Sequence, residues 1–264
     1  MQCKLFCLAM REASLAAVFD LTPPGAGALF WREERLDLSR LHRLNYTGTV
    51  PPGGVRNNQV ALLAELRLRD APGRPLLVGV THLAAAKQEA GESLRRQQVI
   101  ELLDFCERHR GDHPLVLAMD MNGAPTRGET AASDVGYEPR AYPAALAHSV
   151  NVKSAYAMAL GSEPKFTTCM RAAWNALLKR PGPRPTDEYA CTLRGACSGR
   201  TLTGKVRGPT EVQHTIDYIL VSSDVGVRRV LLPPDEAEVE DGRLPSWRYP
   251  SDHVMLCAEL HFDL

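Results

Sequence analysis

Short hydrophobic runs that end in polar residues recur along this chain. Residues 76–80 lead into Thr81 and His82, and residues 115–119 lead into Asp120. Short continuous apolar runs of this kind predict buried strands, whose polar residues lie at the rim of the sheet. We therefore expect the side chains that follow these runs to lie at a sheet edge.

Two later segments repeat the pattern. Asp217 lies between Ile216 and Tyr218 at the start of an apolar run, and His253 follows Asp252 just before the last apolar run. Residues at strand ends and in the loops beyond them can converge on one cleft although they are far apart in sequence. The order of these acid, amide and imidazole clusters predicts an active site.

Further strands follow from the same pattern. Residues 59–68 alternate in part between apolar and polar positions, and the turn residues 70–73 separate them from a strand at 75–81. This spacing predicts an antiparallel hairpin. Other strands are expected at residues 28–31, 115–119, 216–221, 227–232 and 254–262.

Helical spacing is clearest in residues 92–110, where Leu94, Val99, Leu102 and Leu103 recur at helical intervals before the cap residue Gly111. We expect this helix to cover one face of the sheet. Short helices are expected at 154–160 and 172–179, and a further helix at residues 8–18 that the prolines at 23 and 24 end. Residues 179–209 are rich in Pro, Gly, Arg and Thr, which predicts a long surface insertion.

The composition limits the fold and the partners. The chain has 264 residues, of which 44% are hydrophobic, which provides enough apolar surface for the core of one domain. Lys plus Arg and Asp plus Glu both number 31, so there is no overall positive charge to attract a long polyanion. A nucleic-acid role would need a local basic cleft.

The seven cysteines form no Cys-x-x-Cys pair and no zinc-finger spacing, which favours reduced thiols in a cytoplasmic protein. Cys106 and Cys257 lie in apolar stretches and are expected in the core. No apolar run has the length of a membrane span, and residues 1–10 are too short and interrupted for a secretory signal. We expect a soluble protein.

Asp120 and Asn122 stand two positions apart just beyond a buried strand. In an extended segment their side chains point the same way, so a carboxylate and an amide would face one spot. The carboxylate could orient a water or bind Mg²⁺, and the amide could donate to an oxyanion. The alternative for an isolated Asp-x-Asn is an Asx-turn at the strand end.

The histidines have comparable alternatives. His82 can donate to a phosphate oxygen, or can be a hydrogen-bonded structural residue. His253 can be a phosphate ligand or an acid/base, and Asp217 can hold its imidazole through one ring nitrogen. Asp217 and Asp252 can instead cap turns.

Several longer stretches accompany these clusters in the same order. They are Ala28 to Phe30, Asn58 to Ala61, Thr81 to Leu83, Leu94 to Gln98, Ser154 to Tyr156, Glu163 to Thr168, His214 to Ile219, Arg243 to Trp247, and Tyr249 to His253. Together they resemble the exonuclease-endonuclease-phosphatase superfamily, whose fold is that of DNase I, and within it the nocturnin and deadenylase-like branch. The resemblance covers residues 25–264, with residues 1–24 as an atypical N-terminal segment.

This resemblance implies an α/β fold, the DNase I-like four-layer sandwich of two mixed β-sheets flanked by helices. It implies a Mg²⁺-dependent phosphohydrolase cleft in which Asp120 activates water and is linked to the metal. Asn122 and His82 would contact the scissile phosphate. His253 would bind phosphate while paired with Asp217.

Two further roles come from the same resemblance. Asn58 would reach the substrate, and Asp252 would lie near the metal. The implied substrates are phosphate esters of RNA 3′ ends, such as poly(A), or of a nucleotide such as NADP(H).

The chain departs from the family pattern in places that matter for metal and substrate. No strand ending in Gln-Glu, whose glutamate is the family's main Mg²⁺ ligand, is present in residues 1–24, and Glu12 is a poor substitute. We expect a chain that lacks the first strands of the domain, with a sheet edge that a protein partner could cover. Ala84, Ala86 and Cys169 stand where cations and a Trp are expected. Lys87, Arg95 and Trp174 are candidate replacements, and each can instead be an ordinary surface residue.

These departures leave three functions open. The first is a Mg²⁺-dependent nuclease or nucleotide phosphatase. The second is a catalytically inactive fragment that binds nucleotide, RNA or a protein. The third is a phosphoinositide or other phosphate-ester hydrolase of the same fold, since fold alone does not choose the leaving group.

Overall fold

The computed structural model describes residues 15–20, 27–47, 59–70, 73, 75–171, 211–239 and 243–262. Its largest sheet has six strands in the order β3-β4-β5-β6-β10-β7. These are β3 (Leu36–Asn45), β4 (Val60–Leu68), β5 (Leu76–His82), β6 (Leu115–Asp120), β7 (Val152–Ser154) and β10 (Asp217–Ser222). The pair β5–β6 is parallel, and the other neighbours are antiparallel. The predicted hairpin of β4 and β5 is confirmed.

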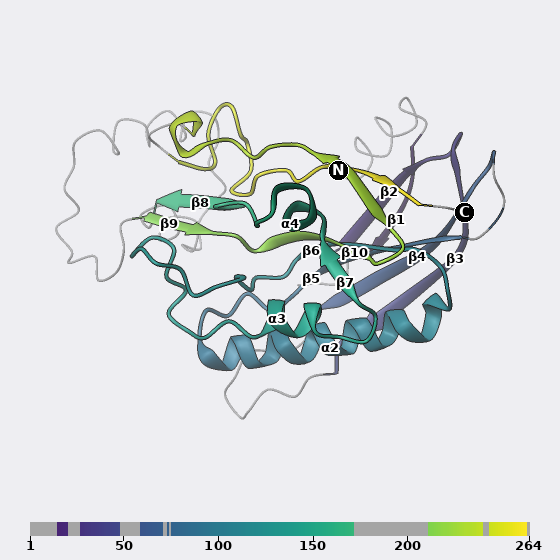
Figure 1. The fold of residues 1–264 in the computed structure, drawn as a ribbon, viewed down its shortest axis with the longest axis horizontal. Helices are drawn as coiled ribbons and strands as arrows, with labels where there is room; N and C mark the ends of the chain where they lie inside the picture. Colours follow the sequence, from purple (N-terminus) through teal and green to yellow (C-terminus); the bar gives the residue numbers. More distant parts are fainter. Residues whose placement is uncertain are drawn as a thin grey trace, which may run out of the picture.

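Helix α2 (Glu89–Arg110) covers one face of this sheet, as its spacing predicted (Figure 1). Leu102 and Leu103 of α2 pack in the main hydrophobic core with Leu63 of β4 and Leu117 of β6. Gly111 follows the helix with a φ of 56°, a left-handed value that glycine adopts at little cost. The short helix α3 (Ala141–Leu146) contacts α2.

The opposite face of the sheet is covered by a two-stranded antiparallel ribbon of β1 (Leu15–Asp20) and β2 (Gly27–Arg32). Leu29 and Trp31 of β2 form a buried cluster with Ala64 and Leu66 of β4. Because side chains alternate along a strand, these β4 residues point away from Leu63 and therefore away from α2. The sheet thus lies between a helical layer and a second β layer.

The structure corrects the sequence prediction at β1. A helix was expected over residues 8–18, but residues 15–18 are part of a strand, and residues 1–14 lie outside the described residues. Ala16 and Val18 pack against the cluster of Leu29 and Trp31. These two positions alternate in the way a strand requires, and packing on β2 overrides the helical preference of the local Leu and Ala residues.

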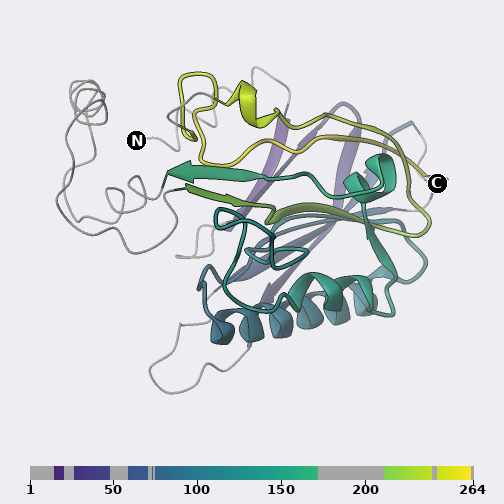
Figure 2. The same ribbon diagram turned by 60° about the vertical axis from the view of Figure 1, so that its left-hand side comes forward.

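The C-terminal third completes the second layer. β11 (Gly226–Val230) pairs with β12 (Ala258–His261), and β8 (Thr168–Arg171) pairs with β9 (Glu211–His214), both antiparallel. Residues 226–239 and 243–262 run along the side of the main sheet opposite α2 (Figure 1 and Figure 2). Helix α4 (Ala155–Leu160), which was predicted, contacts β10 and β11, and a 3₁₀ turn forms at Glu236–Glu238.

Several predicted features change or lie outside the described residues. The last strand begins at Ala258 rather than 254, and Cys257 just before it is exposed rather than in the core, whereas Cys106 is buried. The predicted helix at 172–179, the insertion at 179–209 and Asn58 fall outside the described residues. No helix among the described residues is long and apolar enough to span a membrane.

Candidate active site

The strand ends at one edge of the main sheet bring three of the predicted residues into one row. His82 ends β5 and is the register partner of Asp120, which ends β6. Asp120 is in turn the register partner of Asp217 at the start of β10. Directly opposed residues project to the same face of a sheet, so the two carboxyl groups lie side by side. His82 Nε2 lies 3.3 Å from Asp120 Oδ2.

His253 reaches this row through β8. It forms an isolated bridge with Thr168, whose Oγ1 donates to the carbonyl oxygen of Asp252 at 2.8 Å. The N–H of Val254 donates to the carbonyl oxygen of Thr167 at 2.7 Å. These contacts fix residues 252–254 against β8.

Asp217 and His253 form a hydrogen-bonded pair. Asp217 Oδ2 accepts from His253 Nδ1 at 2.8 Å and from Thr167 Oγ1 at 2.6 Å. The Thr167 hydroxyl accepts from the N–H groups of Ile216 and Asp217, at 3.0 and 3.1 Å. Because Thr167 is fully buried, this arrangement fixes the carboxylate and directs Nε2 of His253 away from it.

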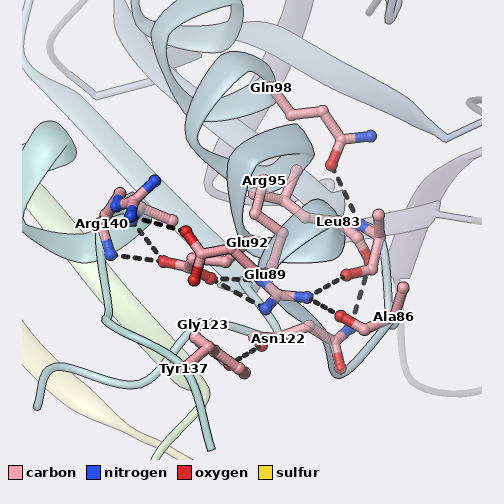
Figure 3. Close-up of polar contacts among 12 residues, drawn as sticks. Leu83, Ala86, Glu89, Glu92, Arg95, Gln98, Asn122, Gly123, Tyr137 and Arg140 are labelled. Carbon is pink, nitrogen blue, oxygen red and sulfur yellow. Dashed lines mark hydrogen bonds and ion pairs between the residues drawn. The ribbon is translucent and has the colours of Figure 1, made fainter. Parts of the chain in front are cut away.

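Asn122 occupies an Asx-turn rather than a continued strand. Its φ is 53°, and its N–H donates to Asp120 Oδ1 at 2.9 Å. The interpretation that Asp120 and Asn122 face one spot because the segment is extended is therefore wrong. The side-chain Nδ2 of Asn122 donates to the carbonyl oxygen of Leu83 at 3.1 Å (Figure 3). This bond ties the ends of β5 and β6 together.

The Asp120 carboxyl has a pKa raised above its usual value. Burial is the larger cause, and the neighbouring Asp217 carboxylate adds to it, while His82, His253 and the N–H of Asn122 act in the opposite direction. A raised pKa makes the carboxylate a better proton acceptor near neutral pH.

The pKa of His253 is raised to about 9, first through its hydrogen bond with Asp217 and despite partial burial. Asp120 and Asp252 also raise it. The ring is therefore an imidazolium at neutral pH, with Nε2 as a charged donor.

The residues present fit a divalent cation in part. Ligand atoms of Asp120, Asp217 and His253 all lie within 4.8 Å of one another. Two adjacent carboxylates match Mg²⁺, which binds through one or two carboxylates plus waters and substrate phosphate oxygens. The imidazole is engaged with Asp217 and is a poor Mg²⁺ ligand. Asp252, the other predicted metal residue, is not part of this group in the described residues.

Two features of the site were missed from the sequence. In the sequence, nothing distinguishes Thr167 from other strand residues. Only the fold shows that its hydroxyl donates to the carboxylate of Asp217. Trp247 is 82% exposed. It lies in a turn closed by a bond from the N–H of Ser246 to the carbonyl oxygen of Tyr249 at 2.6 Å.

The loop that carries Trp247 is anchored beside the site at both ends. The N–H of Leu244 donates to the carbonyl oxygen of Cys169 at 2.8 Å, and His253 bridges to the adjacent Thr168. The exposed indole therefore stands on a loop that begins and ends on β8. In the sequence, Trp247 is part of the stretch Arg243 to Trp247 that resembles the family, but the sequence assigns no role to it.

The chain is similar in sequence to nocturnins. It is 27% identical to nocturnin of Drosophila melanogaster over 250 residues, which cover 89% of this chain and 32% of that protein. It is 28% identical to that of Xenopus laevis and 27% identical to that of Homo sapiens, over 91% and 90% of this chain. The chain spans about a third to a half of the length of these relatives. No protein-family profile matches it.

Solved structures show the same fold. The human nocturnin catalytic domain with bound sulfate aligns with a TM-score of 0.63 at 23% identity, over 98% of this chain and 76% of that one. ANGEL2, a 2′,3′-cyclic phosphatase, in complex with adenosine-2′,3′-vanadate gives 0.61 at 15% identity, over 98% and 78%. A Bacteroides thetaiotaomicron mannosyl-6-phosphatase gives 0.56 at 17%, over 97% and 80%.

The fold is therefore that of the DNase I-like endonuclease/exonuclease/phosphatase proteins. Within that class the chain is a homologue of the nocturnins.

Proposed function

We propose that this chain is a metal-dependent phosphohydrolase that cleaves a phosphate ester of a nucleotide or of an RNA 3′ end. The observation that carries the proposal is the register row of His82, Asp120 and Asp217, joined by His253 at hydrogen-bonding distance from Asp217. Acid, base and cationic donors are thereby placed at one sheet edge.

Each residue has a chemical task that follows from its environment. Asp120, which stands between His82 and Asp217 in the row, orients the attacking water and accepts its proton. His253 donates from Nε2 to a non-bridging phosphate oxygen, and Asp217 keeps that ring oriented. His82 and the second N–H of the Asn122 amide are further donors for the developing charge.

A cation is needed for charge balance. The row contains two carboxyl groups against one imidazolium, so a phosphate dianion would be repelled without an added positive charge. Asp120 and Asp217 would hold Mg²⁺ together with water and phosphate oxygens. When bound, the ion neutralises phosphate charge and stabilises the leaving oxygen.

The substrate class rests on Trp247. Its exposed indole is carried by a loop whose two ends are held on β8, next to His253, and we infer that it offers a flat surface for a nucleobase, with stacking that is tolerant of base identity. This favours a nucleotide or RNA end over a sugar phosphate. The nocturnin homologues support the same choice.

The test is a rate measurement on the purified chain with Mg²⁺ against oligo(A), NADP⁺, adenosine 2′,3′-cyclic phosphate and mannose 6-phosphate. We expect turnover of at least one adenosine substrate, loss of turnover with EDTA, and recovery with added Mg²⁺. Asp120→Asn should lose turnover while remaining folded by circular dichroism. Unchanged turnover in that variant would remove Asp120 from the reaction.

A second function is favoured by a specific observation. The described site provides two carboxylates, and residues 1–24 contain no Gln-Glu pair. A chain that binds a nucleotide or RNA without hydrolysing it would show titratable binding of AMP or oligo(A) and no Mg²⁺-dependent turnover. The same panel therefore separates an enzyme from a binding protein.

A further inference from the structure

Three polar residues, Glu92, Arg95 and Gln98, form a row on one face of α2. A spacing of three residues places them next to one another on the helix surface. All three are 0% exposed, although these residue types are rarely buried without partners. Their partners therefore identify what the row does.

Glu92 holds the start of α3. Its Oε1 accepts from the N–H groups of Arg140 and Ala141, the latter at 2.7 Å. The Arg140 guanidinium also lies 2.6 Å from Glu89 Oε1, one turn earlier on α2 (Figure 3). The loop that begins at Asn122 therefore ends at residues 140 and 141, which are held by α2.

Arg95 holds the segment that follows His82. Its Nε and Nη2 both lie 2.8 Å from Glu92 Oε2. Its Nη1 donates to the carbonyl oxygens of Ala84, at 2.9 Å, and Ala86 (Figure 3). Arg95 is 0% exposed and its partners are internal, so it does not serve as a substrate cation.

Gln98 joins the same segment to a third one. Its Oε1 accepts from the N–H of Ala84 at 3.0 Å, and its Nε2 donates to Gln59 Oε1 at 3.1 Å. Gln59 directly follows Asn58. One face of α2 therefore contacts Gln59, the segment that follows His82, and the end of the loop that begins at Asn122.

The segment held by Arg95 is linked directly to the site. The N–H of Leu83 donates to the carbonyl oxygen of Asp120 at 2.9 Å, and the carbonyl oxygen of Leu83 accepts the Asn122 amide. Tyr137, whose hydroxyl donates to the carbonyl oxygen of Asn122 at 3.4 Å, lies under the Arg95 guanidinium, 5.0 Å from its ring centre. A shift of Arg95 would therefore move both donors.

We propose that Glu92, Arg95 and Gln98 are positioning residues for phosphate hydrolysis. They act through the loops and fix where His82 and Asn122 present their donors. Charge-assisted hydrogen bonds are suited to this task because they are short and directional. The inference rests on the proposed function, and it adds residues that lie outside the reacting row.

The test compares variants at the two ends of α2. Gln98→Met and Arg95→Lys alter the row while keeping side-chain length. Leu103→Ala and Arg110→Met lower stability from the other end of the helix, where Arg110 pairs with Asp224 at 2.8 Å. kcat and KM are measured at a temperature where circular dichroism shows every variant folded.

We expect the row variants to lower kcat about 10- to 100-fold with a smaller change in KM and unchanged pH limbs, because a misplacement near 1 Å can cost about 100-fold. The variants at the other end should keep kcat within about twofold. Loss of kcat in Leu103→Ala equal to that in Gln98→Met, or no loss in either row variant, would overturn the proposal.

A second measurement reads positioning without turnover. Hydrogen exchange by mass spectrometry should show faster exchange in residues 83–88 of both row variants, and in residues 121–141 of Arg95→Lys, with residues 111–118 unchanged. Uniform acceleration, or change confined to α2, would contradict the positioning role. If the native chain hydrolyses nothing, the proposed function fails while this measurement still decides what the row holds.

Discussion

The two halves of α2 bury the same helix face by opposite means. The first half buries the polar residues Glu92, Arg95 and Gln98 together with Leu94, whereas the buried residues of the second half, among them Leu102 and Leu103, are all apolar. The second half packs on strands in the main core, and the first half packs on loops. Burial of a helix face therefore does not require apolar residues throughout.

The difference follows from the backbone that each half contacts. Strand N–H and C=O groups are paired within the sheet, so an apolar side chain can cover them without cost. The segment after His82 has carbonyl and amide groups at Ala84 and Ala86 that no strand pairs, and Arg95 and Gln98 satisfy them. The buried polar residues of α2 therefore lie where the helix hydrogen-bonds to irregular backbone, and that backbone is next to the candidate site.

The largest expected effect is at the site edge, in Asp217→Asn. The amide keeps the volume but no longer stabilises the His253 imidazolium, so kcat should fall about 10²- to 10⁴-fold. Asp224→Asn is the matched control, because Asp224 pairs with Arg110 beyond the far end of β10. Steady-state kinetics of both variants measure the contrast. Equal kcat in the two variants would show that the Asp217–His253 pair is structural only.

Leu103→Ala tests the apolar half of α2. Leu103 is 1% exposed in the main core, so the truncation should lower the free energy of unfolding by about 2–5 kcal/mol. Urea unfolding followed by circular dichroism measures it. The exposed Leu160→Ala is the control and should change stability by less than about 0.5 kcal/mol. A loss of less than about 1 kcal/mol in the free energy of unfolding would mean that Leu103 contributes little to the packing of the main core.

The same contrast explains which parts of the fold and of the site could be predicted from the sequence. Apolar periodicity predicted α2, β5 and β6, and with them the edge where His82 and Asp120 meet. It could not predict Glu92, Arg95 or Gln98 as buried, because each residue type is normally found at the surface and its partners are loop atoms fixed only by the fold. The Asn122 turn was predicted only as the alternative to an extended segment, since an i, i+2 spacing does not encode the positive φ that decides between them.

Five strands were not predicted, namely β1, β3, β7, β8 and β9. For β3 and β1 the reason is local. β3 reads as a charged stretch, yet it is an edge strand, where charged side chains are tolerated and discourage pairing with other chains. Its alternation is also interrupted by a register shift between Leu38 and Arg40. β1 has helix-favouring residues, and only its packing on β2 makes it a strand.

Trp247→Ala tests the loop that carries Trp247 separately from the row of His82, Asp120 and Asp217. If a nucleobase stacks on the indole, KM for an adenosine substrate should rise about 5- to 150-fold, corresponding to about 1–3 kcal/mol, with kcat little changed. Trp247→Phe should retain most of the affinity. Mannose 6-phosphate, if it is hydrolysed, should be unaffected. A KM that rises equally for both substrates would indicate a general loop defect rather than base stacking.

The smallest expected effect is a pH dependence that distinguishes two histidines on either side of Thr168. The pKa of His253 is raised to about 9 by Asp217, so its contribution to the free energy of unfolding is full below about 6.5 and is lost as pH rises towards 9. The pKa of His214 is lowered to about 4 by burial and by Lys87, so the wild type loses stability as pH falls from about 6.5 to 4. Urea unfolding in EDTA should show the difference between wild type and His253→Gln shrinking from pH 6.5 to 9. The difference from His214→Gln should change only from pH 4 to 6.5. If both differences change in the same window, the two imidazoles do not have opposite charge states at neutral pH, and His253 is not the charged donor of the site.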